Sequence, residues 1–222
     1  MPSPRLRNKN KGAPLRRAAP FRRRLVVMAK VPVAGRVKTR LAAEVGVAAA
    51  VRCARACTAA VLQRIGTDAR WLTTVAVTPD GACRSPARPR GLEVEPQGRG
   101  DLGMRMQRLF DRAGPGPVVI VGTDVPNIAR VHVAAAFRLL GGHAAVLGPA
   151  TDGGYWLIGM ARRPHVPRPF AGVRWSSPHA LADTLANLRG RRVARVATLP
   201  DVDTPADLAR SAASIGRVVH PL

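Results

Sequence analysis

Aspartates in two segments have the residue type and the setting that a divalent cation needs. Asp124 follows the apolar run 118–121 and a glycine in the segment PVVIVGTDVP, and Asp201 and Asp203 lie in the segment LPDVDTPADL. Hard cations such as Mg²⁺ and Mn²⁺ prefer carboxylate oxygens. Asp124 could instead cap the following helix or form an Asx turn. Its interpretation as a metal ligand therefore needs a partner, and Asp201 and Asp203 are the candidates.

A loop rich in basic side chains follows the first expected strand. Between residues 29 and 41 it leads through proline, glycine and positive residues into an Ala-rich helical segment. Backbone N–H groups at a helix start, together with Lys or Arg, are suited to binding phosphate. The GxxxxGK[ST] pattern is absent, because Pro32 and Val37 stand where it needs glycine, and an exposed basic helix start is the alternative interpretation. The candidate nucleotide-binding residues here are Ala29, Lys30, Gly35, Arg36, Lys38, Thr39 and Arg40.

Asp101 lies in the Gly-rich stretch QGRGDLGMRM, residues 97–106. Apolar residues recur near a helical period from Leu102 onward, so Asp101 is the predicted N-cap of that helix. The preceding glycines would also let the chain approach a nucleoside, a role that the cap does not exclude. Asp101 and Arg105 are therefore further candidates for nucleotide binding.

The segment 152–156, DGGYW, contains the chain's single tyrosine beside one of its three tryptophans. Consecutive glycines let a backbone approach a ligand closely, and aromatic rings offer a flat wall for a sugar or a base. A turn followed by a strand whose rings face the core is the alternative. The candidate sugar or acceptor residues are Gly153, Gly154, Tyr155, Trp156, Trp175 and Ser176.

Short apolar and β-branched runs alternate with helical segments, which predicts an α/β fold with a mostly parallel central sheet and helices on both faces. The run 118–121 is apolar throughout, as expected for a central strand. Ligands of open α/β sheets collect outside the carboxyl ends of such strands, where Asp124 is expected. The other strands are expected at 25–28, 71–77, 92–94, 144–147 and 192–197. The helices are expected at 42–65 with a break near Gly46, from 102, at 128–140, at 178–188 after Ser177 as N-cap, and from 205 after Thr204 as N-cap.

The formal charge of +23 is unevenly distributed. Residues 1–24, the basic arm, hold nine Lys or Arg residues and no Asp or Glu, so they are predicted to be disordered. This arm could be a phosphate-seeking tail, a weak targeting segment or the product of an upstream start. Residues 25–215 are expected to form one domain and 216–222 a tail. The basic body suits an anionic substrate such as a nucleotide.

No apolar run approaches the roughly 20 residues that span a bilayer, which predicts no membrane span. An odd number of cysteines without a secretion signal favours reduced thiols and a cytoplasmic location. Cys53 and Cys57 share a helical face and could place two metal ligands. Small buried residues are the preferred interpretation, because no His or further Cys pair accompanies them.

Six motifs, taken in order, resemble an uncharacterised bacterial branch of the GT-A, or nucleotide-diphospho-sugar transferase, superfamily, whose members are often labelled glycosyltransferase. A more distant resemblance is to the guanylyltransferases that activate phospholactate and molybdopterin. Several motifs in order are harder to meet by accident than any one alone. They are AK at 29–30 with GRVKTRL at 35–41, GDLG at 100–103, GTDVP at 122–126, DGGY at 152–155, WS at 175–176 and DVDTP at 201–205.

The resemblance implies a single Rossmann-like GT-A domain whose loop 30–40 receives the nucleotide phosphates and whose Asp101 approaches the nucleoside. Asp124 takes the place of the metal-binding aspartate of a DxD motif. The first carboxylate of that motif is missing, so Asp203 is the implied second ligand. Residues 153–156 and 175–176 would face the sugar or the acceptor.

The expected function is a divalent-metal-dependent transferase that uses a nucleotide-activated donor, namely a glycosyltransferase acting on an NDP-sugar. Mg²⁺ or Mn²⁺ would be held by Asp124 and Asp203, while Lys38 and Arg40 share the charge on the leaving diphosphate. Asp152 is the candidate general base. A nucleotidyltransferase that joins an NTP to a small phosphorylated acceptor is the alternative. A nucleic-acid-binding protein is a weaker hypothesis, because few aromatic side chains are available to stack on bases.

Overall fold

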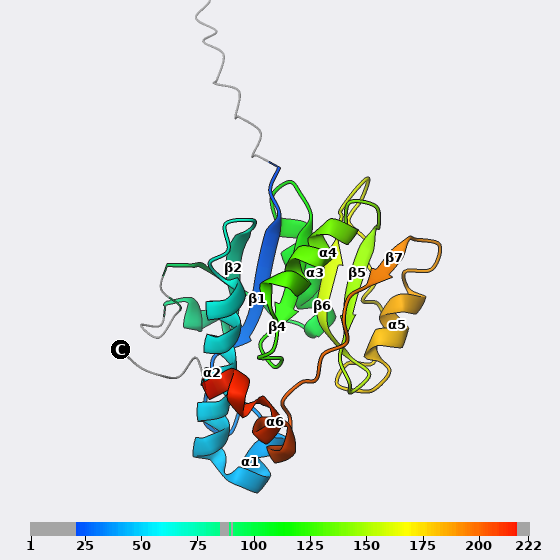
Figure 1. The fold of residues 1–222 in the computed structure, drawn as a ribbon. Helices are drawn as coiled ribbons and strands as arrows, with labels where there is room; N and C mark the ends of the chain where they lie inside the picture. Colours follow the sequence, from blue (N-terminus) through cyan, green and yellow to red (C-terminus); the bar gives the residue numbers. More distant parts are fainter. Residues whose placement is uncertain (1–20, 85–88, 90, 217–222) are drawn as a thin grey trace, which may run out of the picture.

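A seven-stranded sheet forms the centre of the chain, with the strand order β3-β2-β1-β4-β6-β5-β7 (Figure 1). Strand β6 is antiparallel to its neighbours β4 and β5, and the other neighbouring strands are parallel. The predicted mostly parallel sheet is thus confirmed. The strands are β1 (Arg24–Lys30), β2 (Leu72–Thr78), β3 (Glu93–Pro96), β4 (Val118–Gly122), β5 (Ala145–Pro149), β6 (Tyr155–Met160) and β7 (Val193–Arg195).

The computed structural model describes residues 21–84, 89 and 91–216. The expectations of a basic arm at 1–24 and of a tail at 216–222 fall mostly outside these residues. Strand β1 begins at Arg24, the last residue assigned to the arm. None of the helices in the described ranges is long and apolar enough to cross a membrane.

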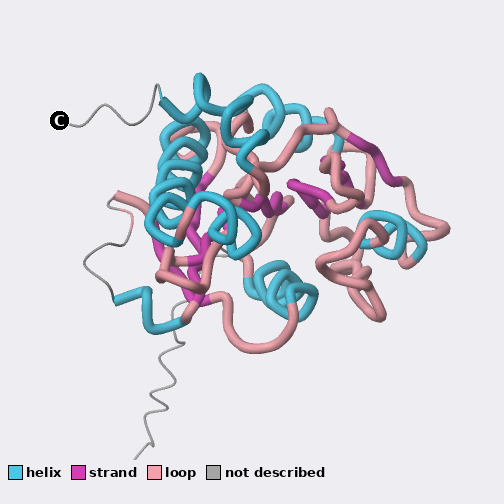
Figure 2. Tube along the Cα trace, turned by 90° about the horizontal axis from the view of Figure 1, so that it is seen from below, coloured by secondary structure: helices cyan, strands magenta, loops and turns pink. Residues whose placement is uncertain are grey.

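Helices cover both faces of the sheet, as predicted. One core cluster joins α2 and α4 to the strands and contains Val27, and the other joins α3 and α5 and contains Val26. Neighbouring residues of a strand point to opposite faces, so adjacent valines of β1 belong to different clusters. Figure 2 shows the helices around the strands. They are α1 (Thr39–Val45), α2 (Val47–Ile65), α3 (Leu102–Arg112), α4 (Arg130–Leu139), α5 (Ala180–Ala186) and α6 (Pro205–Gly216), with a 3₁₀ helix at Asp80–Arg84.

Strand β4 is central, as its composition predicted. Its residues 118–121 are each at most 2% exposed. Both of its faces are covered by helices, so a polar side chain there would lose its hydration without gaining a partner. The uninterrupted apolar run is the consequence.

Local signals account for several helix ends. Gly46 separates α1 from α2 with φ 82°, a left-handed value that glycine tolerates best. Asp101 caps α3, since its Oδ1 accepts a hydrogen bond from the Met104 backbone N–H at 2.7 Å. Both predicted features are confirmed.

The predicted start of α5 is wrong. The helix begins at Ala180, and Ser177 is not its N-cap. Instead the Ser177 hydroxyl donates to the Arg174 carbonyl at 2.6 Å and accepts from the His179 N–H at 3.2 Å. These bonds close a separate turn before the helix, because serine competes locally for backbone partners.

The connections create a crevice at the carboxyl ends of β1 and β4. From β1 the chain passes through α2 to β2 on one face of the sheet, whereas from β3 it returns through α3 to β4 on the other. Loops that leave neighbouring strands in opposite directions open a ligand crevice between them. In Figure 1 this end of the sheet faces down, toward α1 and α6.

Candidate active site

A cleft of about 750 Å³ opens at this crevice. Its walls come from the loops after β1 and β4, the start of α3, the turn before β6 and the segments before α5 and α6. The predicted site residues that line it are Lys30, Lys38, Thr39, Arg40, Arg105, Asp124, Asp152, Gly154, Tyr155, Trp156, Trp175, Ser176 and Asp203. Those outside the lining are Ala29, Gly35, Arg36, Asp101 and Gly153.

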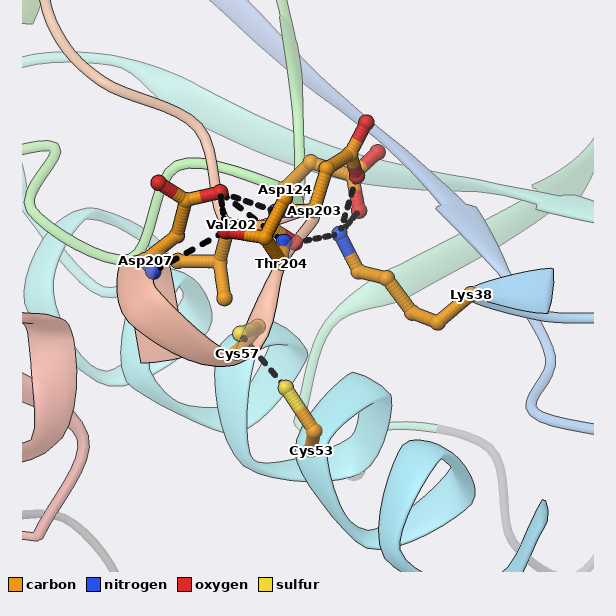
Figure 3. A network of polar contacts seen from close by, with 8 residues as sticks. All are labelled: Lys38, Cys53, Cys57, Asp124, Val202, Asp203, Thr204 and Asp207. Atoms are coloured by element: carbon orange, nitrogen blue, oxygen red, sulfur yellow. Dashed lines mark hydrogen bonds and ion pairs between the residues drawn. The ribbon is translucent and has the colours of Figure 1, made fainter. Parts of the chain in front are cut away.

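Lys38 joins the two expected metal ligands. Its Nζ lies 2.5 Å from Oδ1 of Asp124 and 3.3 Å from Oδ1 of Asp203 (Figure 3). The same ammonium donates to the Val202 carbonyl at 2.6 Å. The Lys38 side chain is only 6% exposed, whereas those of Asp124 and Asp203 are 64% and 40% exposed. Two carboxylates distant in sequence thus converge on one buried cation and still face solvent.

Local structure brings these three side chains together. Lys38 is the residue before α1 and has a left-handed backbone, with φ 47° and ψ 47°. Asp124 follows β4, and its carbonyl accepts a hydrogen bond from the Val202 N–H at 3.0 Å. This bond ties the loop after β4 to the segment before α6. On that segment, Asp207 accepts from the Asp203 N–H at 3.1 Å.

Burial and neighbouring charges together shift the pKa values of Lys38 and Asp201. Burial lowers the pKa of Lys38, but the ion pairs with Asp124 and Asp203 outweigh it, so the pKa is raised and the ammonium stays charged at neutral pH. Asp201 also lines the cleft. Burial first, and then the negative charge of Asp152, raise its pKa. Four aspartates therefore border the cleft, and one lysine neutralises part of their charge.

Other cations line the cleft. Lys30 and Arg40 have no ion-pair partner among the residues that the structure describes. Arg105 also borders the cleft, and its Nε donates to the Gly100 carbonyl at 2.8 Å. Unpaired cations at a cleft wall attract and bind phosphate.

The aromatic side chains take different positions. Tyr155 and Trp175 meet edge to face with ring centroids 6.4 Å apart, and the Tyr155 hydroxyl accepts from the Thr184 hydroxyl at 3.3 Å. Trp156 is 4% exposed, and its indole N–H donates to the Ala197 carbonyl at 3.1 Å. Trp156 therefore packs mainly in the core, although it borders the cleft.

Gly153 approaches the protein's own backbone. It has φ 87°, and a Cβ built on it would lie 2.3 Å from the Pro178 carbonyl oxygen. The turn before β6 therefore packs directly against the segment before α5. This contact fixes one edge of the cleft.

Gln97 is a cleft residue that the sequence did not single out. It is 3% exposed, and its Nε2 donates to the carbonyls of Ala29 at 3.2 Å and Ala76 at 2.9 Å. These bonds hold the end of β1 against β2. Its position directly after β3 and before two glycines was the available signal.

Cys53 and Cys57 are buried, with their sulfurs 4.0 Å apart, in a small cluster with Leu41 and Val202. Figure 3 shows them beneath the Lys38 network. The hydrogen bond between the thiols lowers the pKa of Cys53 to about 7 and raises that of Cys57. Their burial agrees with the preferred interpretation of small core residues.

The residues present fit a divalent cation by their donor chemistry. Asp124 and Asp203 offer hard oxygens that already converge on one positive charge. Within the described part of the chain, no three His, Cys, Asp or Glu side chains group closely enough to hold a metal ion. Substrate phosphate and water would complete the shell, as is usual for Mg²⁺.

Fold and site together define a class: a single Rossmann-like α/β domain of the GT-A and nucleotidyltransferase type. A family described as "Uncharacterized protein conserved in bacteria (DUF2064)" matches residues 58–177, more than half of the sequence. The chain belongs to this family, which confirms the expected resemblance. No curated protein matches the sequence.

Solved structures place the fold among nucleotide-using transferases. One is a "putative nucleotide-diphospho-sugar transferase" from Desulfovibrio desulfuricans G20, with 26% identity and a TM-score of 0.72 over 89% of this chain and 98% of that one. CMP:2-keto-3-deoxy-manno-octonic acid synthetase, complexed with CTP, has 16% identity and a TM-score of 0.55 over 88% and 99%. Glucosyl-3-phosphoglycerate synthase from Mycobacterium tuberculosis, with Mn²⁺, UDP and phosphoglyceric acid, has 14% identity and a TM-score of 0.52 over 90% and 76%.

Proposed function

We propose that this protein is a divalent-metal-dependent transferase that takes a nucleotide-activated donor, and that the donor is an NDP-sugar. The convergence of Lys38, Asp124 and Asp203 in a cleft at the carboxyl ends of β1 and β4 carries the proposal. The relative with 26% identity, described as a "putative nucleotide-diphospho-sugar transferase", supports it. Glucosyl-3-phosphoglycerate synthase, which has the same fold, was solved with Mn²⁺ and UDP.

Different residues of the cleft bind the metal ion and the phosphate groups. Asp124 and Asp203 would hold Mg²⁺ or Mn²⁺, which supplies positive charge to the diphosphate when bound. Lys30, Lys38 and Arg40 bind phosphate oxygens and stabilise the charge that develops as the diphosphate leaves. One well-placed group of this kind lowers a barrier by about 3 kcal/mol.

Another part of the cleft receives the sugar and the acceptor. Tyr155 and Trp175 form an apolar wall there, with the Ser176 segment beside it. Asp152 faces the same cleft and is the candidate to accept the proton of the acceptor hydroxyl. Its Oδ1 also accepts from the Gly154 N–H at 2.8 Å, which fixes the carboxylate's direction.

Nucleotidyl transfer is the second candidate. The sequence Gly122-Thr123-Asp124 has one carboxylate where a DxD motif has two, and CMP:2-keto-3-deoxy-manno-octonic acid synthetase shares the fold. In this reaction an NTP would give its nucleotidyl group to a phosphorylated acceptor and release pyrophosphate. Arg105 adds a further cation for the longer phosphate chain.

A thermal-shift screen distinguishes the two candidates. With Mg²⁺ present, UDP-sugars and GDP-sugars are compared with GTP and CTP. A ligand that binds only the folded state raises its stability by about 2.7 kcal/mol at a hundred times its Kd. We expect an NDP-sugar to raise the melting temperature. Stabilisation by triphosphates alone would favour nucleotidyl transfer.

Asp124→Asn tests the site itself. On the donor found by the screen, we expect turnover to fall by about 10²- to 10³-fold, the usual cost of losing one electrostatic group. The melting temperature should stay near that of the parent protein, because the carboxylate is 64% exposed and the amide still accepts from Lys38. Asp111→Asn, which removes a surface ion pair with Arg168, is the control. Full metal-dependent turnover by Asp124→Asn would refute the assignment.

A further inference from the structure

We propose that Lys38 is a tethered competitor of the divalent cation: its ammonium holds the cation position between Asp124 and Asp203 in the free protein, and a metal enters only when a diphosphate draws the ammonium away. This role rests on the proposed function, because it needs a substrate that brings phosphate and metal together. It makes Lys38 a residue that controls the order of binding as well as one that binds phosphate.

The Lys38 ammonium is fully satisfied without any ligand. Its Nζ donates hydrogen bonds to the Val202 carbonyl at 2.6 Å and to Oδ1 of Asp203 at 3.3 Å, and it forms an ion pair with Oδ1 of Asp124 at 2.5 Å. The side chain is 6% exposed. The ammonium of Lys38 is therefore a buried cation bound by protein oxygens, not a solvated surface charge.

A metal and this ammonium exclude each other. Mg²⁺ binds carboxylate oxygens at about 2.1 Å, so a metal shared by Asp124 and Asp203 would occupy the space that Nζ now fills. If the metal ion and the Lys38 ammonium both lay between these carboxylates, their positive charges would also repel strongly, because the site is partly buried. A bare cation must therefore displace an ammonium held by three acceptors.

A diphosphate provides a second place for the ammonium. Lys30 and Arg40 line the same cleft and recruit phosphate oxygens close to Lys38. The four-carbon stem of lysine lets Nζ move while the backbone stays fixed. Once the ammonium donates to phosphate, the two carboxylates are free for the metal that accompanies the diphosphate. Metal and diphosphate must then strengthen each other's binding equally, as linkage requires.

The first test measures Mn²⁺ affinity of the nucleotide-free protein by electron paramagnetic resonance. Lys38→Met replaces the lysine with an apolar side chain of similar length and so removes the charge. We expect it to bind Mn²⁺ at least about tenfold more tightly than the parent, which corresponds to about 1.4 kcal/mol. Lys38→Arg, which keeps a cation, should stay as weak as the parent.

Two controls locate the effect. Lys30→Met removes a cleft charge that does not contact Asp124 or Asp203 and should leave Mn²⁺ affinity within about twofold of the parent, as expected for a solvated charge. Adding Asp203→Asn to Lys38→Met should abolish the gained affinity. A gain that persists without Asp203 would overturn the shared-site argument.

The second test uses the unaltered chain, so it does not depend on a variant that folds. The lysines of the sequence are Lys9, Lys11, Lys30 and Lys38, which makes the NMR spectrum of ¹⁵N-lysine-labelled protein simple. The buried ammonium of Lys38 should give a slowly exchanging signal. Mg²⁺ alone should leave that signal in place, and Mg²⁺ with inorganic pyrophosphate should shift it. A full shift with Mg²⁺ alone would overturn the proposal.

The outcomes separate this role from the proposed function. Suppose the parent binds Mn²⁺ through Asp124 as tightly without pyrophosphate as with it, and Lys38→Met gains nothing. The competitor role then fails, and the transferase stands. If neither protein binds Mn²⁺ under any of these conditions and Asp124→Asn keeps full turnover, both fail.

Discussion

Lys38 and Gly153, in the cleft region, have backbone conformations that their surroundings impose. Lys38 has φ 47°, a region that costs a residue with a side chain about 1–3 kcal/mol and persists only where other contacts hold it. The three acceptors around its ammonium are such contacts. Gly153 has φ 87° and lies so close to the Pro178 carbonyl that a Cβ does not fit. Strain and close approach thus coincide at the site.

Gly153→Ala should destabilise the protein more than Gly172→Ala. Both positions have positive φ, but a Cβ at Gly172 meets nothing within 4 Å, whereas at Gly153 it lies 2.3 Å from a backbone oxygen. We expect Gly153→Ala to cost about 2 kcal/mol more, the usual cost of overpacking. Urea unfolding of both variants measures the difference. Equal losses would show that φ alone, and not the contact with Pro178, requires glycine.

At the scale of elements, the start of α6 positions Asp203. Asp207 accepts from the Thr204 N–H at 2.8 Å and from its hydroxyl at 2.7 Å, and the Asp207 N–H donates back to that hydroxyl. Burial raises the pKa of Asp207, but these hydrogen bonds outweigh it and lower the pKa below 3.8. A lowered folded-state pKa adds stability above the unfolded value and loses it as the pH falls further.

Asp207→Asn should therefore weaken both the cap and the site. At neutral pH we expect a loss of about 1 kcal/mol, typical of a helix cap, and weaker Mn²⁺ binding in the presence of pyrophosphate, because Asp203 is less fixed. Thermal unfolding should show the stability gap between parent and variant shrinking as the pH falls below the unfolded value of 3.8.

Asp183→Asn is the matched control. Its carboxylate pairs with Arg174, which lowers the pKa to about 2, but it does not line the cleft. It should show a similar pH dependence with unchanged Mn²⁺ binding. Equal effects of the two variants on Mn²⁺ binding would remove the link between the α6 cap and Asp203.

At the scale of the whole molecule, the charge of +23 contrasts with the balanced charge of the cleft, whose lining holds four aspartates and four Lys or Arg residues. Four aspartates border the cleft beside its cations, which suits a phosphate that arrives with a metal. A nucleic-acid surface instead needs basic side chains with aromatic rings among them. Charge alone does not assign a nucleic-acid role to the domain.

A chain that lacks residues 1–20 should lose most of any salt-dependent DNA affinity. Those residues hold six Lys or Arg and no acidic residue, so the slope of log K against log salt should fall by up to about 5. The rise in melting temperature with Mg²⁺ and nucleotide should remain. Fluorescence anisotropy at several salt concentrations measures the slope. Tight binding that survives the truncation would revive the nucleic-acid hypothesis.

Features that depend on near neighbours in the chain were predictable from the amino-acid sequence. The apolar run before Asp124 predicted a central strand, because a strand covered on both faces cannot hold polar groups. Gly46, Asp101 and Thr204 predicted helix ends, because caps and left-handed residues act within one turn. Ser177 was wrongly predicted as an N-cap, because its hydroxyl can bond to several nearby backbone groups. The sequence does not show which of these bonds forms.

The contacts of the Lys38 side chain, in contrast, follow from the folded arrangement of distant segments. The sequence predicted that Lys38 binds phosphate, whereas in the folded chain its ammonium lies between Asp124 and Asp203. That position depends on the left-handed backbone of Lys38 and on the hydrogen bond from Val202 to Asp124, which joins segments far apart in the chain. A long side chain reaches several partners, and distant backbone contacts select among them.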